Sequence, residues 1–251
     1  MIFWILVIAA FIVFFALVFA VLKSIWKAFV LAVGILFIVF SVTAVLAILD
    51  AREFGRQIQS SPHLFLLEED GRPLAAMEDV MSKRGASVPT EEEFSEYSRL
   101  YSEGDYEGLL EDNYRVFVVS TSAFDDLPSG SFGESDSFGK PAIMEMLRSD
   151  NAVDVFIDKT IEESKAPKEQ IPLIRDKLED EAPEEAKLRS SLFSLLLQAS
   201  LEDAGPMYIL EEYKEGTISI YPETMLFRFL NYMPSSVLDK AAETANKEGK
   251  D

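Results

Sequence analysis

Hydrophobic positions divide this chain into an apolar beginning and a longer part with mixed polarity. Residues 2–22 contain no polar side chain, and residues 28–49 are almost wholly apolar. As helices these runs would measure about 31 and 33 Å, which matches the hydrocarbon core of a bilayer. The pattern predicts a transmembrane helical hairpin over 1–50, with a turn at 23–27. A buried helical hairpin in a soluble protein is the alternative.

Several residues in this segment have the chemistry of a membrane interface. Indole rings prefer the boundary between lipid and water, and lysine side chains can extend their charge into the headgroups. The first core is too long for a cleaved signal peptide and has no basic residues before it. The predicted interface residues are Trp4, Lys23, Trp26 and Lys27.

Small residues recur along both predicted spans, and they suggest how the two helices would pack. If the turn centres on Ile25, antiparallel packing pairs Ala16 with Gly34 and Ala9 with Ser41. Small side chains let membrane helices approach closely, so these four positions form the predicted helix contact. Neither span contains an ionisable residue, which argues against a channel or pump built from this hairpin alone.

The orientation of the hairpin rests on basic residues beside the spans. Lys23 and Lys27 in the turn are nearly balanced by Arg52 and Arg56 on the far flank. The other flank is a single methionine, which favours a cytoplasmic turn. The sequence therefore favours a two-pass protein whose soluble domain lies outside the cytoplasm.

After a juxtamembrane linker or short helix continuation at 51–61, the pattern predicts an acidic soluble α+β domain over 62–251. Apolar and β-branched runs predict two β-hairpins, one at 63–77 with a turn at Asp70-Gly71 and one at 207–221 around Lys-Glu-Gly. A single strand is predicted at 114–120. Helical spacing predicts about seven helices. They cover approximately 91–101, 105–112, 141–148, 153–161, 171–178, 184–203 and 223–233, and Ser236 with Asp239 could cap one more.

Two local signals in this part are specific. Thr90 followed by Glu93 has the spacing of a capping box, in which each side chain accepts from the other residue's backbone N–H. The aromatic helix at 223–233 carries Phe227, Phe229, Leu230, Tyr232 and Met233. We interpret its apolar residues as core packing rather than as a groove for a partner.

Charge and composition narrow the possible functions. All 43 acidic residues and 21 of the 23 basic residues lie from Asp50 onward, which gives that part a formal charge of −22. Such a surface repels nucleic-acid phosphates and anionic headgroups, so no nucleic-acid partner is expected. The chain contains no cysteine, which excludes disulfides, thiolate metal sites and cysteine nucleophiles.

The motifs that could carry catalysis are weak. The loop at 125–139 follows a strand like a phosphate-binding loop, but its four acids, Asp125, Asp126, Glu134 and Asp136, would repel phosphate. These acids could bind Ca²⁺, although the alternating spacing of a calcium loop is missing.

Two further candidates for catalysis have simpler explanations. Ser137 and Lys140 match S-x-x-K, but Gly139 and Pro141 argue that no helix joins them. His63 is the only imidazole, and we interpret it as a surface or packing residue.

The leading hypothesis is a membrane-anchored interaction, assembly or accessory domain without a cofactor. Its expected partners are the lipid bilayer and a protein that is basic or itself membrane-bound. The alternative is a membrane-anchored hydrolase using carboxylates or a divalent metal. Because its helices and hairpins carry their own caps and turns, a fragment of residues 60–251 is expected to fold alone.

Overall fold

A computed structural model describes residues 2–57, 60–78, 87–111, 113–128, 138–204 and 208–232. Side chains are described from Lys27 onward, except at Ala28, Gly55, Asp203 and Ala204. The chain divides into two compact units, Met1–Leu49 and Asp50–Asp251. The described part of the second unit has an α+β fold, as the sequence predicts.

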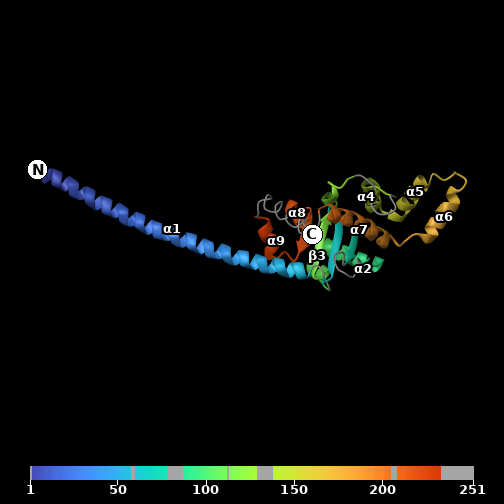
Figure 1. Ribbon diagram of the computed structural model, residues 1–251, viewed down its shortest axis with the longest axis horizontal. Coiled ribbons are helices and arrows are strands. Elements are labelled where there is room, and N and C mark those ends of the chain that lie inside the picture. The colour runs from blue at the N-terminus through green and yellow to red at the C-terminus, as the bar shows by residue number, and fades with distance from the viewer. Residues whose placement is uncertain are drawn as a thin grey trace, which may run out of the picture. The chain divides into compact units, whose positions relative to one another are not determined.

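The N-terminal unit lies within one continuous helix, α1 (Ile2–Gln57) (Figure 1). The predicted turn at 23–27 is therefore not present as a break in the helix. Lys-Ser-Ile-Trp-Lys contains neither glycine nor proline, so nothing in this segment interrupts the i to i−4 hydrogen bonds. Among the described side chains, the stretch Phe29–Phe54 is long and apolar enough to cross a membrane, a property that signal sequences share.

The last two turns of α1, from Asp50 to Gln57, belong to the second unit. Of the two predictions for 51–61, a linker or a short helix continuation, the structure agrees with the second as far as Gln57. Phe54 packs against the main hydrophobic core of the domain. The domain therefore begins in structural terms at Asp50, before the predicted start at residue 62.

A four-stranded mixed sheet in the order β2-β1-β3-β4 forms the centre of the domain. β1 (His63–Glu69) and β2 (Arg72–Glu78) form the first predicted hairpin, with Asp70 and Gly71 at positive φ in its turn. β3 (Arg115–Ser120) pairs in parallel with β1, and β4 (Ile218–Tyr221) pairs antiparallel with β3. The strand predicted to stand alone is thus a central strand.

The second predicted hairpin is wrong. Residues 208–215 form a helix, α8 (Tyr208–Glu215), and only β4 is a strand. The apolar run at 207–210 is too short to distinguish a strand from a buried helical turn. Gly216 has φ +83° and ends this helix, while the Thr217 N–H donates to Glu212 O at 3.0 Å. The glycine that suggested a hairpin turn is a helix C-cap.

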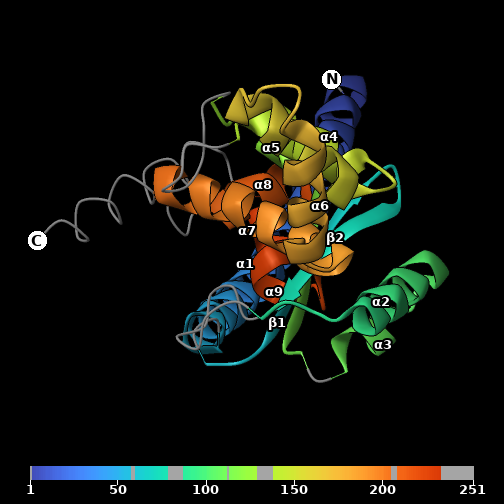
Figure 2. The same cartoon turned by 90° about the vertical axis from the view of Figure 1, so that its right-hand side faces the viewer.

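Helices cover both faces of the sheet (Figure 2). One face carries α2 (Glu91–Glu103) and α3 (Tyr106–Leu110), which cover Leu64, Leu66, Val116 and Val118. The other face, with Phe65, Leu67, Phe117 and Val119, forms the larger core. The elements on this side include the 3₁₀ turn η1 (Thr121–Phe124), α4 (Lys140–Arg148), α5 (Ala152–Ser164), α7 (Glu185–Ala204), α8 and α9 (Met225–Leu230).

Helical spacing predicts an apolar stripe on α7, the longest helix in the described part of the domain, at Leu188, Leu192, Leu195, Leu196 and Ala199. Leu188, Leu192 and Leu196 are buried, and Leu195 and Ala199 are partly buried. The Ser190 hydroxyl of α7 donates to Ala76 O of β2 at 2.5 Å, which fixes the helix to the edge of the sheet. By contrast, α6 (Ile171–Glu181) has no buried residue and packs mainly on α5.

Candidate functional site

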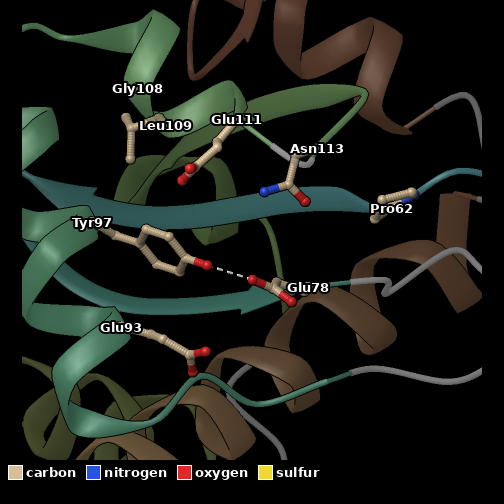
Figure 3. Close-up of a pocket in the computed structure, with 8 residues that line it drawn as sticks. All are labelled: Pro62, Glu78, Glu93, Tyr97, Gly108, Leu109, Glu111 and Asn113. Atoms are coloured by element: carbon tan, nitrogen blue, oxygen red, sulfur yellow. Dashed lines mark hydrogen bonds between the residues drawn. The ribbon is translucent and has the colours of Figure 1, made fainter.

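A cavity of about 240 Å³ lies where α2 and α3 meet the sheet. Figure 3 shows its lining residues, which come from the end of β2, from both helices and from the segments that precede β1 and β3. They are Pro62, Glu78, Glu93, Tyr97, Gly108, Leu109, Glu111 and Asn113. Among the described residues of this lining are three glutamates and no lysine or arginine, so the described lining is acidic.

The predicted capping box places Glu93 in this cavity. The Thr90 N–H donates to Glu93 Oε2 at 2.7 Å, and the Glu93 N–H donates to the Thr90 hydroxyl at 3.3 Å. The hydrogen bond from the Thr90 backbone lowers the pKa of the Glu93 carboxyl. Glu93 therefore contributes a fixed negative charge near neutral pH.

Tyr97 is the central aromatic side chain of the cavity. Its hydroxyl donates a hydrogen bond to Glu78 Oε1, as Figure 3 shows. Burial raises the pKa of the Tyr97 phenol, and so do this hydrogen bond and the nearby carboxylates of Glu78, Glu93 and Glu111. Tyr97 thus stays protonated at physiological pH and acts as a donor that orients Glu78.

Close packing of α2 against α3 shapes the cavity wall. Asp105 caps α3 by accepting from the Gly108 N–H at 2.9 Å. A Cβ atom on Gly108 would lie 2.8 Å from Asp105 Oδ2 and 2.9 Å from Leu100 Cδ2. Only glycine therefore fits here without displacing the cap or the core.

The far wall of the cavity is fixed at the start of the two parallel strands. Pro62 precedes β1, Asn113 lies just before β3, and the Tyr114 N–H donates to Pro62 O at 2.8 Å. Without the parallel pairing of β1 with β3, Pro62 and Asn113 would not line one cavity. No local sequence pattern indicates this pairing, so Glu78, Glu111 and Asn113 were missed as site residues.

A second unusual site is the buried guanidinium of Arg115, whose side chain is 2% exposed. It lies 4.9 to 5.3 Å from the ring centroids of Phe54, Tyr114 and Phe227, and it donates to Pro222 O at 2.8 Å. Its nearest carboxylate is Asp50, at 3.7 Å. Because a buried charge needs partners, this cluster ties the end of α1 to the sheet and to α9.

The residues that the sequence offered as catalytic candidates do not come together at the acidic cavity or at the Arg115 cluster. His63 is fully buried, and its ring makes edge contacts with Tyr114 and Phe117, both at 5.7 Å, which confirms a packing role. Lys140 begins α4 and donates to Asp125 O at 2.7 Å. Ser137, Glu134 and Asp136 lie outside the described residues.

The described residues contain no group of three or more His, Asp or Glu side chains arranged to hold a metal ion. Burial raises the pKa of the Glu212 carboxyl, which accepts a hydrogen bond from the Thr217 hydroxyl. Glu212 does not line the acidic cavity.

The predicted membrane residues lie in α1. The Lys27 side chain is exposed, a Cβ on Gly34 would meet nothing within 4 Å, and the Ser41 hydroxyl donates to Phe37 O at 2.8 Å. The side chains of Trp4, Ala9, Ala16, Lys23 and Trp26 lie outside the described part. The predicted contact between Ala16 and Gly34 needs a chain reversal that α1 does not have, and it stays a prediction.

Neither a family model, nor a curated protein sequence, nor a solved structure matches this chain.

Proposed function

We propose that this protein is a membrane-anchored binding domain that receives a basic side chain of a protein partner in its acidic cavity. The observation that carries the proposal is the described lining: Glu78, Glu93 and Glu111 lie around Tyr97, and the described lining residues include no lysine or arginine. A lysine ammonium or an arginine guanidinium offers donors to these carboxylates, and the tyrosine ring attracts a cation.

The formal charge of −22 from Asp50 onward supports the same class of partner at longer range. A surface with one sign of charge attracts a partner of opposite sign and speeds its association, and added salt weakens this attraction. The cavity would then fix the position of one basic side chain within a wider acidic surface.

Binding of a fluorescent tetra-arginine peptide to the full chain in detergent tests this proposal. The double variant Glu78→Gln with Glu111→Gln removes two cavity charges but leaves an oxygen that can accept from Tyr97. We expect at least a tenfold weaker affinity, which corresponds to about 1.4 kcal/mol. The matched control, Glu92→Gln with Glu107→Gln, removes two exposed charges from α2 and α3, the helices that line the cavity, without changing a lining residue.

Only a selective loss in the cavity variant supports a defined site. Equal weakening in both double variants would show that the peptide senses the overall charge alone. If the wild-type chain does not bind the peptide at low salt, the proposed function is wrong.

We also propose that α1 anchors the domain in a membrane. The 21 uncharged residues from 29 to 49 support this, because together they are about 32 Å long as a helix. In the two-pass version of this proposal, residues 2–22 and residues 28–49 each cross the membrane, and the domain lies outside the cytoplasm. This version requires the helix to break at 23–27.

Cysteine accessibility distinguishes these topologies, because the native chain has no cysteine. Ile2→Cys and Lys250→Cys should react with an impermeant maleimide from the same side in a two-pass protein and from opposite sides in a one-pass protein. Reaction of Lys250→Cys in intact cells would place the domain outside the cytoplasm. A crosslink between Ala16→Cys and Gly34→Cys in a double variant would support the predicted helix contact.

A further inference from the structure

The short helix α9 buries some of its apolar side chains in the core, while other large side chains in and beside it are exposed. Phe227 and Leu230 are buried in the core, as predicted for the aromatic helix. Tyr232, also predicted to be core, is instead 87% exposed, because α9 ends at Leu230, and Met225 is 41% exposed. We propose that α9 lies in the lipid headgroup layer and rests on the bilayer surface. This proposal depends on the anchoring role proposed for α1.

α9 contacts the first charged residue that follows the apolar segment of α1. Asp50 is the first charged residue after the uncharged run from 29 to 49, so it marks the edge of the hydrocarbon core. Asp50 Oδ2 accepts a hydrogen bond from the Leu226 N–H at 2.7 Å. The first turn of α9 is therefore held at the level of the membrane boundary.

The dimensions of a bilayer agree with this placement. Each headgroup layer is about 5–8 Å thick, which is half the difference between the full bilayer and its hydrocarbon core. Met225 directly precedes Leu226, and consecutive Cα atoms are about 3.8 Å apart. Met225 thus lies within one headgroup layer of Asp50. Phe54 and Phe227, with ring centroids 5.4 Å apart, hold the next turn against α1.

The exposed side chains around this contact suit a lipid interface. Tyrosine and other amphipathic rings collect at that level, and arginine side chains can extend toward lipid phosphates. Arg52 is exposed on α1, and the Arg228 side chain of α9 is 62% exposed. Arg228 pairs with Glu223 at 3.2 Å, and across residues 50–57 and 223–230 three arginines match three acidic residues. This part of an otherwise strongly acidic domain therefore carries no net formal charge.

The bilayer is the occupant that these observations favour over a second protein. The large apolar side chains exposed in the described part of the domain are Val88, Leu173, Met225 and Tyr232. Two of these four, Met225 and Tyr232, lie in α9 or just after it. α9 is also the helix that contacts Asp50, the first charged residue after the proposed span. Binding of a second protein would not require the exposed side chains to lie beside Asp50, where the proposed span ends.

Depth-dependent fluorescence quenching in phosphatidylcholine liposomes tests the placement of α9. Single cysteines replace Met225, Tyr232, Leu173 or Phe37 in the full chain, and each carries an environment-sensitive fluorophore. We expect lipids spin-labelled near the headgroup to remove most of the fluorescence at Met225→Cys, with Tyr232→Cys as a second probe of this segment. The Leu173→Cys control, on α6 and 73% exposed, should respond only to aqueous iodide.

The Phe37→Cys probe separates this inference from the anchoring proposal. Phe37 is 71% exposed within the proposed span, so deeply labelled lipids should quench it. Quenching at Phe37 with a Met225 probe that behaves like Leu173 overturns the placement of α9 alone. A Met225 probe shielded from both lipid and iodide would also overturn it and would point to a protein covering this face. If deep labels do not quench Phe37, both proposals fall.

Discussion

At the scale of single residues, Arg115 and Asp50 form the least ordinary contact in the domain. The guanidinium is buried among three aromatic rings, and its Nε has no hydrogen-bond partner among the described residues. The Asp50 carboxylate at 3.7 Å balances its charge, and the same carboxylate accepts from the Leu226 N–H. One side chain therefore joins α1 to both β3 and α9.

Asp50→Asn isolates the charge of this contact, since the amide oxygen can still accept from Leu226. We expect the free energy of unfolding of the full chain in detergent to fall by about 1–3 kcal/mol, because a buried cation loses its counterion. Glu53→Gln is the matched control: Glu53 lies one turn away and pairs with the exposed Arg56. The control should leave the unfolding midpoint unchanged, and equal effects of both substitutions would contradict a special role for Asp50.

A second residue-scale prediction concerns alkaline pH. The Tyr213 hydroxyl donates to Glu223 Oε1 at 2.6 Å, and burial together with this carboxylate raises the pKa of Tyr213 to about 12. The folded state then keeps a proton that the unfolded state releases above pH 10, so stability should decline between pH 10 and 12.

Tyr213→Phe removes this titrating group together with its hydrogen bond. Urea denaturation should show a less stable protein at pH 8 and a shallower loss of stability from pH 10 to 12. The same slope in wild type and variant would mean that Tyr213 does not titrate as described.

At the scale of elements, sequence patterns predicted features that depend on neighbouring residues. The capping box at Thr90, the hairpin turn at Asp70-Gly71 and the stripe of α7 are set within a few turns of chain, and the structure confirms them. The parallel pairing of β1 with β3 joins residues about fifty positions apart and leaves no local pattern. The acidic cavity depends on that pairing, and this explains why Glu93 was identified as a cap but not as a site residue.

The wrong predictions at this scale also concern features that are decided by contacts between residues far apart in the sequence. Residues 207–210 were interpreted as a strand because four apolar residues fit either period, and packing against the core selects the helix α8. Burial of Arg115 was not predicted, because arginine is usually exposed and its partners Asp50 and Pro222 lie far away in sequence.

Gly108→Ala tests how strictly the α2–α3 contact is packed. The new methyl group would meet Asp105 Oδ2 at 2.8 Å, and Asp105 cannot move away without breaking its cap on α3. We expect a loss of about 1–3 kcal/mol in stability, typical of overpacking, and weaker peptide binding in the adjacent cavity. Glu107→Ala, at an exposed position one residue earlier, should change little when both variants are followed by thermal unfolding. A stable Gly108→Ala variant with normal binding would show that the two helices can separate freely.

At the scale of the whole molecule, the boundary between the two units coincides with the change from apolar to polar sequence at Asp50. Residues 51–61 were expected to form a linker or a short continuation of the helix, with the folded domain starting after them. The structure continues the helix through residue 57 and uses residues 50–57 as part of the domain. A polar segment that follows an apolar helix can thus be a structural element of the domain when its partners, here Arg115 and Phe227, come from later in the chain.

This boundary gives a prediction that revises the expectation for residues 60–251. A fragment of residues 50–251 retains Asp50 and Phe54, whereas one of residues 60–251 leaves the Arg115 guanidinium without its carboxylate and uncovers the Phe227 ring. Removing one partner of a buried ion pair costs about 3–5 kcal/mol when the pair is fully buried. Asp50 is 17% exposed, so we expect the lower part of that range, together with the lost burial of Phe54.

Urea denaturation followed by circular dichroism compares the two fragments directly. The longer fragment should unfold in one cooperative transition at the higher urea concentration, and the shorter one should unfold earlier and bind more of a dye that reports exposed apolar surface. A fragment of 50–251 carrying Phe54→Ala separates the two contributions, since it keeps the carboxylate and loses only the ring. Equal midpoints for 50–251 and 60–251 would show that the domain is complete without the end of α1, and that Arg115 finds sufficient partners in Pro222 and the remaining rings.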